Sequence, residues 1–173
     1  MADESKQKIL WQLSQVAPSE PFAEKRGINY HAAPTDDYSI KREDMLKLAR
    51  QYIDCINRHD LDGAIAMLDD QMADRTLPGE PVTKDGVRQN YTALMGPFPD
   101  LSLSVINIYV DGDMFVINGE LSGTSQNEFY GTPATGKPFT TFMLEIFKVR
   151  GQKFVERYFW FDAMKIVRAI TAP

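Results

Sequence analysis

The sequence predicts an α+β domain in which three amphipathic helices precede an antiparallel meander of four strands. Two changes along the chain carry this prediction. Between about residues 43 and 95, apolar residues recur every three to four positions, as on one face of a helix. After Gly96 they recur every second position, as in a half-buried strand. The 173 residues, 43% of them hydrophobic, suffice for one domain with an apolar core and an extension.

The first 42 residues differ from the rest, so we divide the chain into an N-terminal arm over 1–42 and an α+β domain over 43–173. Apolar residues between 8 and 16 predict one short helix in the arm. The stretch that follows carries three prolines and no sustained periodicity, which is typical of an extended segment. The arm's aromatic residues indicate that it packs on its own domain or on a partner subunit. They are Trp11, Phe22 and Tyr30.

Three helices are predicted in the first half of the domain. Each has apolar residues at helical spacing, and each is preceded or begun by a residue that can accept hydrogen bonds from free backbone N–H groups. The apolar stripes run over 45–56, 61–68 and 87–94. The residues placed to cap the helices are Ser39 or Asp44 for the first, Asp60 for the second and Thr83 for the third.

Four strands are predicted in the second half of the domain. The turn sequences Asp111-Gly112-Asp113 and Gly151-Gln152 join them in two hairpins. The last two strands are apolar at odd and even positions alike, so both of their faces must be covered. We expect the helices to cover one face and another subunit to cover the other. The strands are expected over 101–110, 114–124, 139–149 and 153–164.

The composition argues against several classes of function. A net charge of −5 gives the chain no general attraction for nucleic acids or anionic membranes. The chain has no long apolar run and no signal-peptide pattern, so we expect a cytoplasmic protein. One cysteine excludes a disulfide within the chain, and two separated histidines make no zinc cluster. No phosphate-binding or dinucleotide motif occurs, and we expect neither a metal nor a cofactor.

A few polar residues interrupt the apolar segments and are the candidates for chemistry. Glu145 lies within FMLEIF, and Arg157 precedes the aromatic run YFWF. Asn118 and Glu120 share one face of their strand, since side chains two positions apart point the same way. Asp74 follows the second helix. Burial in a partly dry pocket raises the pKa of a carboxyl group, which then suits a general acid or base.

Two registers of the last hairpin are open. A loop of three residues places Glu145 opposite Arg157 and Met143 opposite Phe159. A loop of two residues places Tyr158 near Glu145 instead, because a slip of one residue exchanges the two faces. Glu145 and Arg157 can be a cross-strand ion pair or a solvent-facing edge pair as well as part of a pocket. A neighbouring arginine would lower the carboxyl pKa and oppose the effect of burial.

Several stretches of the domain match the sequence pattern of a known family. From FYGTPATGK to Phe161-Asp162 the match needs no gap. The matching stretches are NRHDLDGAIAML (57–68), FPDL (98–101), DGD (111–113), SGT (122–124), EFYGTPATGKPF (128–139), IFKV (146–149) and FVERYFWFDAM (154–164). From about residue 43 to 170 the chain resembles the SnoaL-like polyketide cyclase family, within the nuclear-transport-factor-two-like fold that includes ketosteroid isomerase. The resemblance implies a cone-shaped α+β barrel, with three helices on a curved, mainly antiparallel sheet of four to six strands enclosing a pocket. It also implies a homodimer through the open sheet face.

The resemblance implies a cofactor-free cyclase, isomerase or lyase that uses an acidic side chain on a hydrophobic, polyketide- or steroid-like carbonyl compound. The acid of the family lies in the last strand, where this chain has Phe159, which cannot transfer a proton. Glu145 or Asp74 would then serve, with Arg157 or Asn118 polarising the carbonyl. The expected pocket residues are Tyr52, Asn118, Glu120, Met143, Phe159, Trp160 and Phe161.

Three functions stay open at this point. The chain can be an enzyme of that kind, a module that binds a small apolar or polycyclic ligand without chemistry, or an interaction protein that uses its sheet face and arm. An enzyme requires Glu145 or Asp74 to point into a closed pocket. A binding module requires a pocket lined by apolar residues alone, and an interaction protein requires a large apolar interface. We expect a small-molecule ligand and a second copy of the chain as partners.

Overall fold

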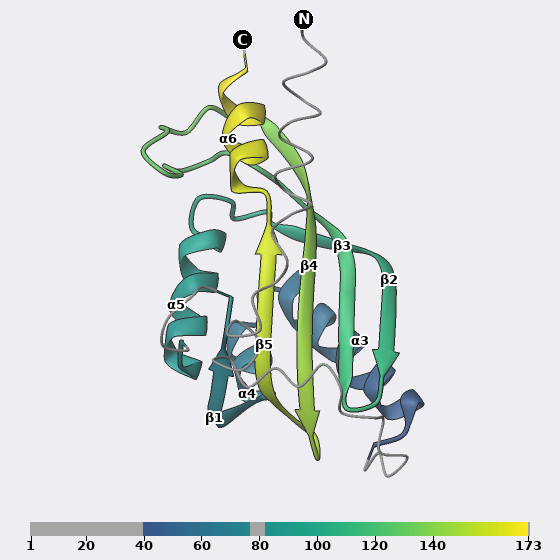
Figure 1. Cartoon of the computed structure of the whole chain (residues 1–173). Helices are drawn as coiled ribbons and strands as arrows, with labels where there is room; N and C mark the ends of the chain where they lie inside the picture. Colours follow the sequence, from purple (N-terminus) through teal and green to yellow (C-terminus); the bar gives the residue numbers. More distant parts are fainter. Residues whose placement is uncertain (1–39, 77–81, 173) are drawn as a thin grey trace, which may run out of the picture. The chain divides into compact units, whose positions relative to one another are not determined.

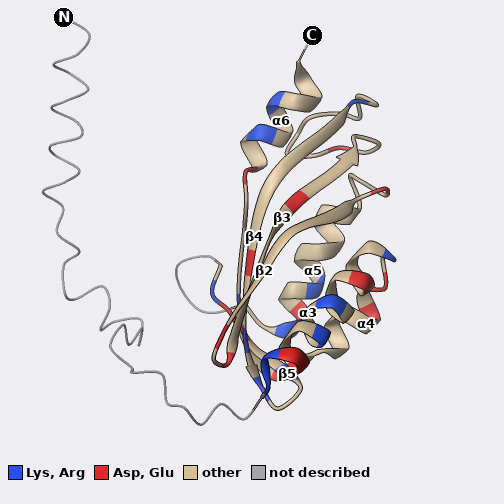
Figure 2. Ribbon diagram, turned by 90° about the vertical axis from the view of Figure 1, so that its right-hand side faces the viewer, with Lys and Arg blue, Asp and Glu red and all other residues tan. Residues whose placement is uncertain are grey.

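The computed structural model describes residues 40–76 and 82–172, so the predicted arm lies outside it except for 40–42 (Figure 1). The described strands form one sheet in the order β1-β5-β4-β3-β2. Helices α3, α4 and α5 cover one of its faces (Figure 2). The predicted α+β architecture with a curved sheet is confirmed. The elements are α3 (Arg42–Asn57), α4 (Leu61–Ala66), β1 (Leu68–Asp74), α5 (Lys84–Met95), β2 (Ser102–Asp111), β3 (Met114–Thr124), β4 (Pro138–Arg150), β5 (Lys153–Phe161) and α6 (Ala163–Thr171).

The first three described helices form where their apolar stripes predict them, but their caps differ. Asp60 caps α4 as predicted, because its side chain accepts a hydrogen bond from a backbone N–H three residues on. The cap predicted for Asp44 is wrong: Asp44 lies in the first turn of α3, where a negative charge favours the helix dipole. Ser39, the other candidate, lies outside the described residues. Thr83 occupies the N-cap position of α5 without a side-chain capping bond.

Strand β1 was not predicted from the sequence. The second helix ends at Ala66 rather than at Leu68, and the chain then extends as LDDQMAD. This acidic stretch forms a strand because it pairs in parallel with β5, placing Asp74 beside Arg157. The two residues are 83 positions apart, so no local pattern announces the pairing.

The predicted meander of β2, β3, β4 and β5 is confirmed, with each strand antiparallel to the next. Its two predicted hairpin turns are present. Gly112 has φ of 59° and Gly151 has φ of 61°, a left-handed conformation that glycine adopts without steric cost. The turns therefore explain why these glycines stand between the alternating segments.

The last strand is shorter than predicted and is followed by a helix. We expected a strand up to 164, but β5 ends at Phe161 and α6 begins at Ala163. Asp162 ends the strand, because its side chain caps α6 by accepting a hydrogen bond from the backbone N–H of Lys165. The helical spacing of the buried residues Ile166 and Ile170 is the signal in the sequence that indicates this helix.

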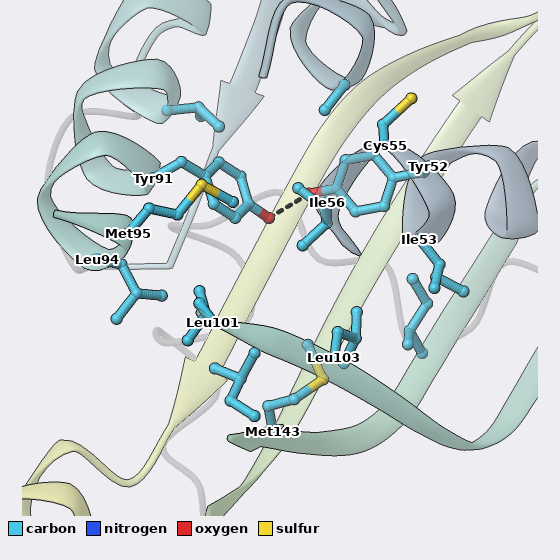
Figure 3. Close-up of a cluster of buried hydrophobic side chains, with 14 of the residues drawn as sticks. Tyr52, Ile53, Cys55, Ile56, Tyr91, Leu94, Met95, Leu101, Leu103 and Met143 are labelled. Atoms are coloured by element: carbon cyan, nitrogen blue, oxygen red, sulfur yellow. Dashed lines mark hydrogen bonds between the residues drawn. The ribbon is translucent and has the colours of Figure 1, made fainter. Parts of the chain in front are cut away.

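The side chains on the two faces of the sheet are buried to different extents. On the face toward the helices, alternate residues of β3 and β4 are buried, among them Phe115, Ile117 and Phe147, and they join the core that Figure 3 shows in part. On the other face, Tyr109 and Trp160 are more than half exposed. The prediction that helices cover one face is confirmed. Cover of the other face by a second subunit stays a prediction.

Candidate functional site

Arg157 is the centre of the buried polar cluster. Its side chain is 2% exposed although it carries a charge, which requires close partners of opposite charge. Its Nε donates to Glu145 Oε1 at 2.6 Å, and its Nη1 donates to Asp74 Oδ2 at 2.5 Å. Both carboxylates are 1% exposed. The three residues predicted to carry chemistry are thus brought together, and their catalytic role stays a prediction.

The register that assembles this cluster differs from both registers derived from the sequence. Glu145 pairs with Phe159, Met143 with Phe161 and Phe147 with Arg157. The hairpin has the two-residue turn, but an irregularity in the pairing just after Lys148 shifts the strands by one further residue. Glu145 and Arg157 are therefore diagonal neighbours on one face, and the long arginine side chain spans the difference.

Two tyrosines from different helices complete the cluster. Tyr52 on α3 and Tyr91 on α5 direct their hydroxyl groups toward each other (Figure 3). Tyr52 donates to Glu145 Oε1 at 2.9 Å, and Tyr91 donates to the same oxygen at 2.7 Å. Arg157 Nη2 in turn donates to the Tyr91 hydroxyl at 2.9 Å. All three of these donors to Glu145 meet at one of its oxygens, Oε1.

Aromatic rings hold the guanidinium plane of Arg157. Its central carbon lies 4.9 Å from the ring centroid of Tyr91 and 4.7 Å from that of Phe159. A cation over the face of a ring is stabilised by about 0.5–1 kcal/mol at an exposed site and by about 2 kcal/mol or more when it is desolvated. Phe159, which replaces the acid expected from the family resemblance, therefore contacts the arginine that the site retains.

The protonation states of the cluster follow from its burial. Burial raises the pKa of the Tyr52 hydroxyl well above its ordinary value, and it also raises the pKa of the Tyr91 hydroxyl. Burial by itself lowers the pKa of Arg157, but the neighbouring Tyr91 and Glu145 more than offset this and leave that pKa raised. Both tyrosines are therefore neutral hydrogen-bond donors, and the guanidinium is charged.

A cavity of about 350 Å³ opens beside this cluster. Asp74, Tyr91 and Arg157 form its polar end, whereas Glu145 and Tyr52 lie behind them and do not line it. The rest of the wall comes from β5, α5, residues between β1 and α5, the residue Pro97 after α5, and the loop between β3 and β4. Its other residues are Thr76, Val82, Asn90, Ala93, Leu94, Pro97, Glu128, Phe129, Tyr130, Phe159 and Phe161.

Three of the predicted pocket residues lie on the wrong face of the sheet. Asn118 pairs with Leu144, which pairs with Trp160, and all three side chains point away from the helices. Glu120 lies two positions from Asn118 on the same face and is exposed. The prediction that Asn118, Glu120 and Trp160 line the pocket is corrected, because alternation shows which residues share a face but not which face the helices cover. Trp160 itself is 57% exposed.

The other pocket predictions divide into two groups. Phe159 and Phe161 line the cavity as expected. Met143 and Tyr52 point toward the helices but belong to the buried core, at 1% exposure each. Tyr52 nevertheless takes part in the polar cluster through its hydroxyl group.

Sequence reasoning missed Tyr91 and the residues of the β3–β4 loop. Tyr91 was placed on an apolar helix stripe, where a tyrosine looks like any other core residue. Phe129 and Tyr130 were noted only within the family-like stretch 128–139, yet Phe129 is buried against Phe98 with ring centroids 4.8 Å apart. Tyr130 has φ of 47°, a strained conformation for a residue with a side chain, and it stands at the cavity wall. The burial of Phe129 and the backbone conformation of Tyr130 become apparent only in the structure, so the sequence did not single out either residue.

Other kinds of site find little support within residues 40–76 and 82–172. No group of three or more His, Cys, Asp or Glu side chains there could hold a metal ion. None of the described helices is long and apolar enough to span a membrane. The cavity is therefore the feature of the described chain on which a functional proposal can rest.

Comparison with known proteins agrees with this fold. A family model described as SnoaL-like polyketide cyclase matches residues 46–170. The structure of AclR from Streptomyces galilaeus, described as a candidate hydroxylase, is 23% identical with a TM-score of 0.71, over 77% of this chain and 100% of that one. IdmH from Streptomyces antibioticus, described as a candidate polyketide cyclase, is 23% identical with a TM-score of 0.66, over 72% and 96%. At these identities the likeness shows the fold alone. No curated protein matches the chain.

Proposed function

Because the chain belongs to the SnoaL-like polyketide cyclase family, we propose that it is an enzyme that transfers protons on a hydrophobic carbonyl compound without a cofactor. The observation that carries the proposal is the buried pair of Arg157 and Asp74 at the polar end of an otherwise largely apolar cavity. Such a cavity binds the apolar body of a ligand and presents a few fixed polar groups to one end of it.

Arg157 supplies the electrophilic part of this proposal. A guanidinium has five N–H groups, and three of them are used in bonds to Glu145, Asp74 and Tyr91. One N–H on each terminal nitrogen is left for the carbonyl oxygen of a ligand in the cavity. Fixed donors that face a developing enolate oxygen stabilise it without reorganisation, and one such donor contributes about 2.7–4 kcal/mol in known enzymes.

Asp74 is the proposed general base. Its Oδ1 accepts a hydrogen bond from the backbone N–H of Thr76 at 2.8 Å, and its Oδ2 accepts from Arg157. These contacts fix the carboxylate at the cavity wall and leave lone pairs for a proton from the carbon next to the carbonyl. Removal of that proton forms an enolate, which is then reprotonated for isomerisation or attacks a second carbonyl for ring closure.

Glu145 has a positioning role in this proposal. It does not line the cavity, and its Oε1 accepts bonds from Tyr52, Tyr91 and Arg157. It therefore orients Arg157 and Tyr91 rather than touching the ligand. The proposal therefore differs from the expectation that Glu145 itself is the acid. In it, Asp74 and Arg157 are the groups that contact the substrate.

Enolisation of a simple ketone tests the proposal without knowledge of the substrate. The protein is incubated in D₂O with 1-tetralone, and exchange at the carbon next to the carbonyl is followed by proton NMR. We expect catalysed exchange that Asp74→Asn reduces by roughly 10²-fold or more. Glu120→Gln, a matched change on the far face, should retain the full rate. Exchange that is no faster than in buffer contradicts the proposal.

A second variant guards against the loss of folding in Asp74→Asn. Ala93 is exposed on α5 and lines the cavity, so Ala93→Trp fills part of the cavity from outside the core. This variant should have the circular dichroism spectrum of the unaltered protein but should no longer catalyse exchange of 1-tetralone. A folded Ala93→Trp protein with the full rate would place the chemistry elsewhere.

A binding module without chemistry is the second candidate, and one observation favours it. Both carboxylates in the cluster are already bonded to Arg157, as in a structural ion pair. On this alternative the cavity binds 1-tetralone without exchange. A thermal shift with the ketone that is lost in Ala93→Trp, together with no exchange in any form, would support it.

We also propose that the chain forms a homodimer through the outer sheet face. This face combines the exposed Tyr109 and Trp160 with the half-buried Phe142, Leu144 and Ile146. Exposed apolar side chains gathered on one surface are typical of interaction sites. An isologous contact of this face with itself would cover the side that the helices leave open.

A further inference from the structure

The loop between β3 and β4 contains a two-residue turn with an unusual residue at its tip. Phe129 and Thr132 exchange two backbone hydrogen bonds, each of 2.9 Å, so Tyr130 and Gly131 form the turn between them. Their φ angles are 47° and 76°, as in a type I′ turn, which requires a left-handed conformation at both positions. Asparagine, aspartate and glycine are the residues favoured at the first position, so the bulky Tyr130 is strained there.

The ring of Tyr130 contributes little to the fold in return for this strain. It packs edge-on against the ring of Phe129, with centroids 4.6 Å apart, but Tyr130 is 75% exposed. Phe129, in contrast, is 5% exposed and packs on Phe98, so it anchors the turn. Backbone strain that the fold does not need is found mostly at functional sites, and Tyr130 lines the cavity. The strained turn therefore points to a role for its side chain in the cavity.

The loop that carries this turn is fixed at the end of the cavity away from Arg157. The backbone N–H of Gln126 donates to the carbonyl oxygen of Pro97 at 3.0 Å, which holds the loop at the C-terminal end of α5. Tyr91, at the polar end of the cavity, precedes Pro97 by six residues, which is about 9 Å along a helix axis. A ligand held by Arg157 therefore reaches Tyr130 only with the far end of its body.

From the strained turn and its place in the cavity, we propose that Tyr130 is a specificity-determining residue that covers the outer end of a bound ligand and selects ligands long enough to reach it. This rests on the proposed function in using the same cavity, but it concerns binding and not proton transfer. The exposed ring loses contact with water when a ligand packs against it, and a shorter ligand gains none of this contact. The strain is then retained for binding, at a cost to the stability of the free protein.

One substitution separates the effects of Tyr130 on stability and on binding. Tyr130→Asn in the full chain removes the ring and places in the turn a residue that type I′ turns favour. We expect the midpoint of thermal unfolding without ligand to rise by about 2–4 °C, because the strain is relieved and a mostly exposed ring is lost. Tyr130→Phe keeps both the ring and the strain, so it should retain the midpoint and the ligand binding of the unaltered protein.

Two methyl ketones of different length measure the effect on binding. Acetophenone carries its ketone on a single ring, and 2-acetylanthracene carries the same group at the end of three rings in line. Binding is followed by NMR titration for acetophenone and by ligand fluorescence for 2-acetylanthracene. Tyr130→Asn should weaken binding of 2-acetylanthracene at least about fivefold and that of acetophenone less than about twofold, because only the longer ketone reaches the turn.

Each outcome bears on the proposal. A lower unfolding midpoint for Tyr130→Asn would show that the ring supports the fold, and would overturn the proposal. Equal weakening of both ketones would remove the selection by length and overturn it as well. Unchanged binding of 2-acetylanthracene in this variant, or no binding of it to the unaltered protein, has the same consequence. Failure of 1-tetralone exchange overturns the enzymatic proposal alone, since these titrations measure binding without chemistry.

Discussion

The two faces of the sheet place the same kinds of side chain in opposite surroundings. Glu145 on β4 points toward the helices, is 1% exposed and accepts three hydrogen bonds. Glu120 on the adjacent β3 points the other way and is exposed. The inner face uses Glu145 in a fixed network beside a cavity, and the outer face leaves Glu120 in contact with solvent. A polar residue in a strand therefore acquires its role from what covers its face.

The largest expected effect is the loss of the buried cation. Arg157→Leu leaves Asp74 and Glu145 buried without their partner, and we expect the free energy of unfolding to fall by about 3–5 kcal/mol. Urea unfolding followed by circular dichroism measures this change. Arg150→Leu removes an exposed arginine at the end of β4 and should change stability by about 0.5 kcal/mol or less. Similar effects of the two substitutions would contradict the central place of Arg157.

A matched pair of glutamate substitutions tests the difference between the faces directly. Glu145→Gln keeps the size of the side chain but weakens the charge-assisted bonds from Arg157 and the tyrosines, and should cost about 1.5–3 kcal/mol of unfolding free energy. Glu120→Gln should cost about 0.5 kcal/mol or less. Chemical denaturation of both variants under the same conditions gives the comparison. Equal costs would mean that the two faces are energetically alike.

Alkaline conditions should weaken the inner face. Burial raises the pKa of Tyr52 and Tyr91 above the value of 10.0 that an unfolded chain has. Above pH 10 the unfolded state releases protons that the folded state keeps, so the free energy of unfolding falls as pH rises. The slope is about 1.4 kcal/mol per pH unit for each tyrosine. Urea unfolding between about pH 8 and about pH 11.5, the range that brackets tyrosine ionisation, measures it.

The substitution Tyr91→Phe provides the control for this slope. It removes one of the two buried hydroxyl groups and should reduce the alkaline loss of stability by about half. An unchanged slope in the variant would show that other groups cause the alkaline loss.

The smallest effect on the fold is expected on the outer face. Trp160 is 57% exposed, so Trp160→Lys should leave the stability of the monomer nearly unchanged. If the proposed homodimer forms through this face, the same substitution should weaken association at least about tenfold. Sedimentation of the full chain, the variant and a form without residues 1–39 measures this. Monomers in the full chain and in the arm-deleted form would remove the dimer proposal.

Much of the fold could be predicted because its signals are local. The stripes of α3 and α5, the cap at Asp60 and the turns at Gly112 and Gly151 all depend on residues within one element or one hairpin. The helix α6 has signals of the same local kind, the cap at Asp162 and the helical spacing of Ile166 and Ile170, although the sequence prediction continued the strand to 164. Periodicity and turn chemistry are short-range properties, and the sequence displays them directly.

The candidate site depended on information of another kind. The sequence by itself determined that Glu145 and Arg157 were unusual among their apolar and aromatic neighbours, and that Asp74 followed the second helix. Only the tertiary structure decided that β1 lies beside β5, that an irregular pairing shifts the last hairpin by one residue, and that helices cover the face of Glu145 rather than that of Glu120. The reason is physical: a strand alternates identically whichever face is buried, and the contact between Asp74 and Arg157 joins residues 83 positions apart.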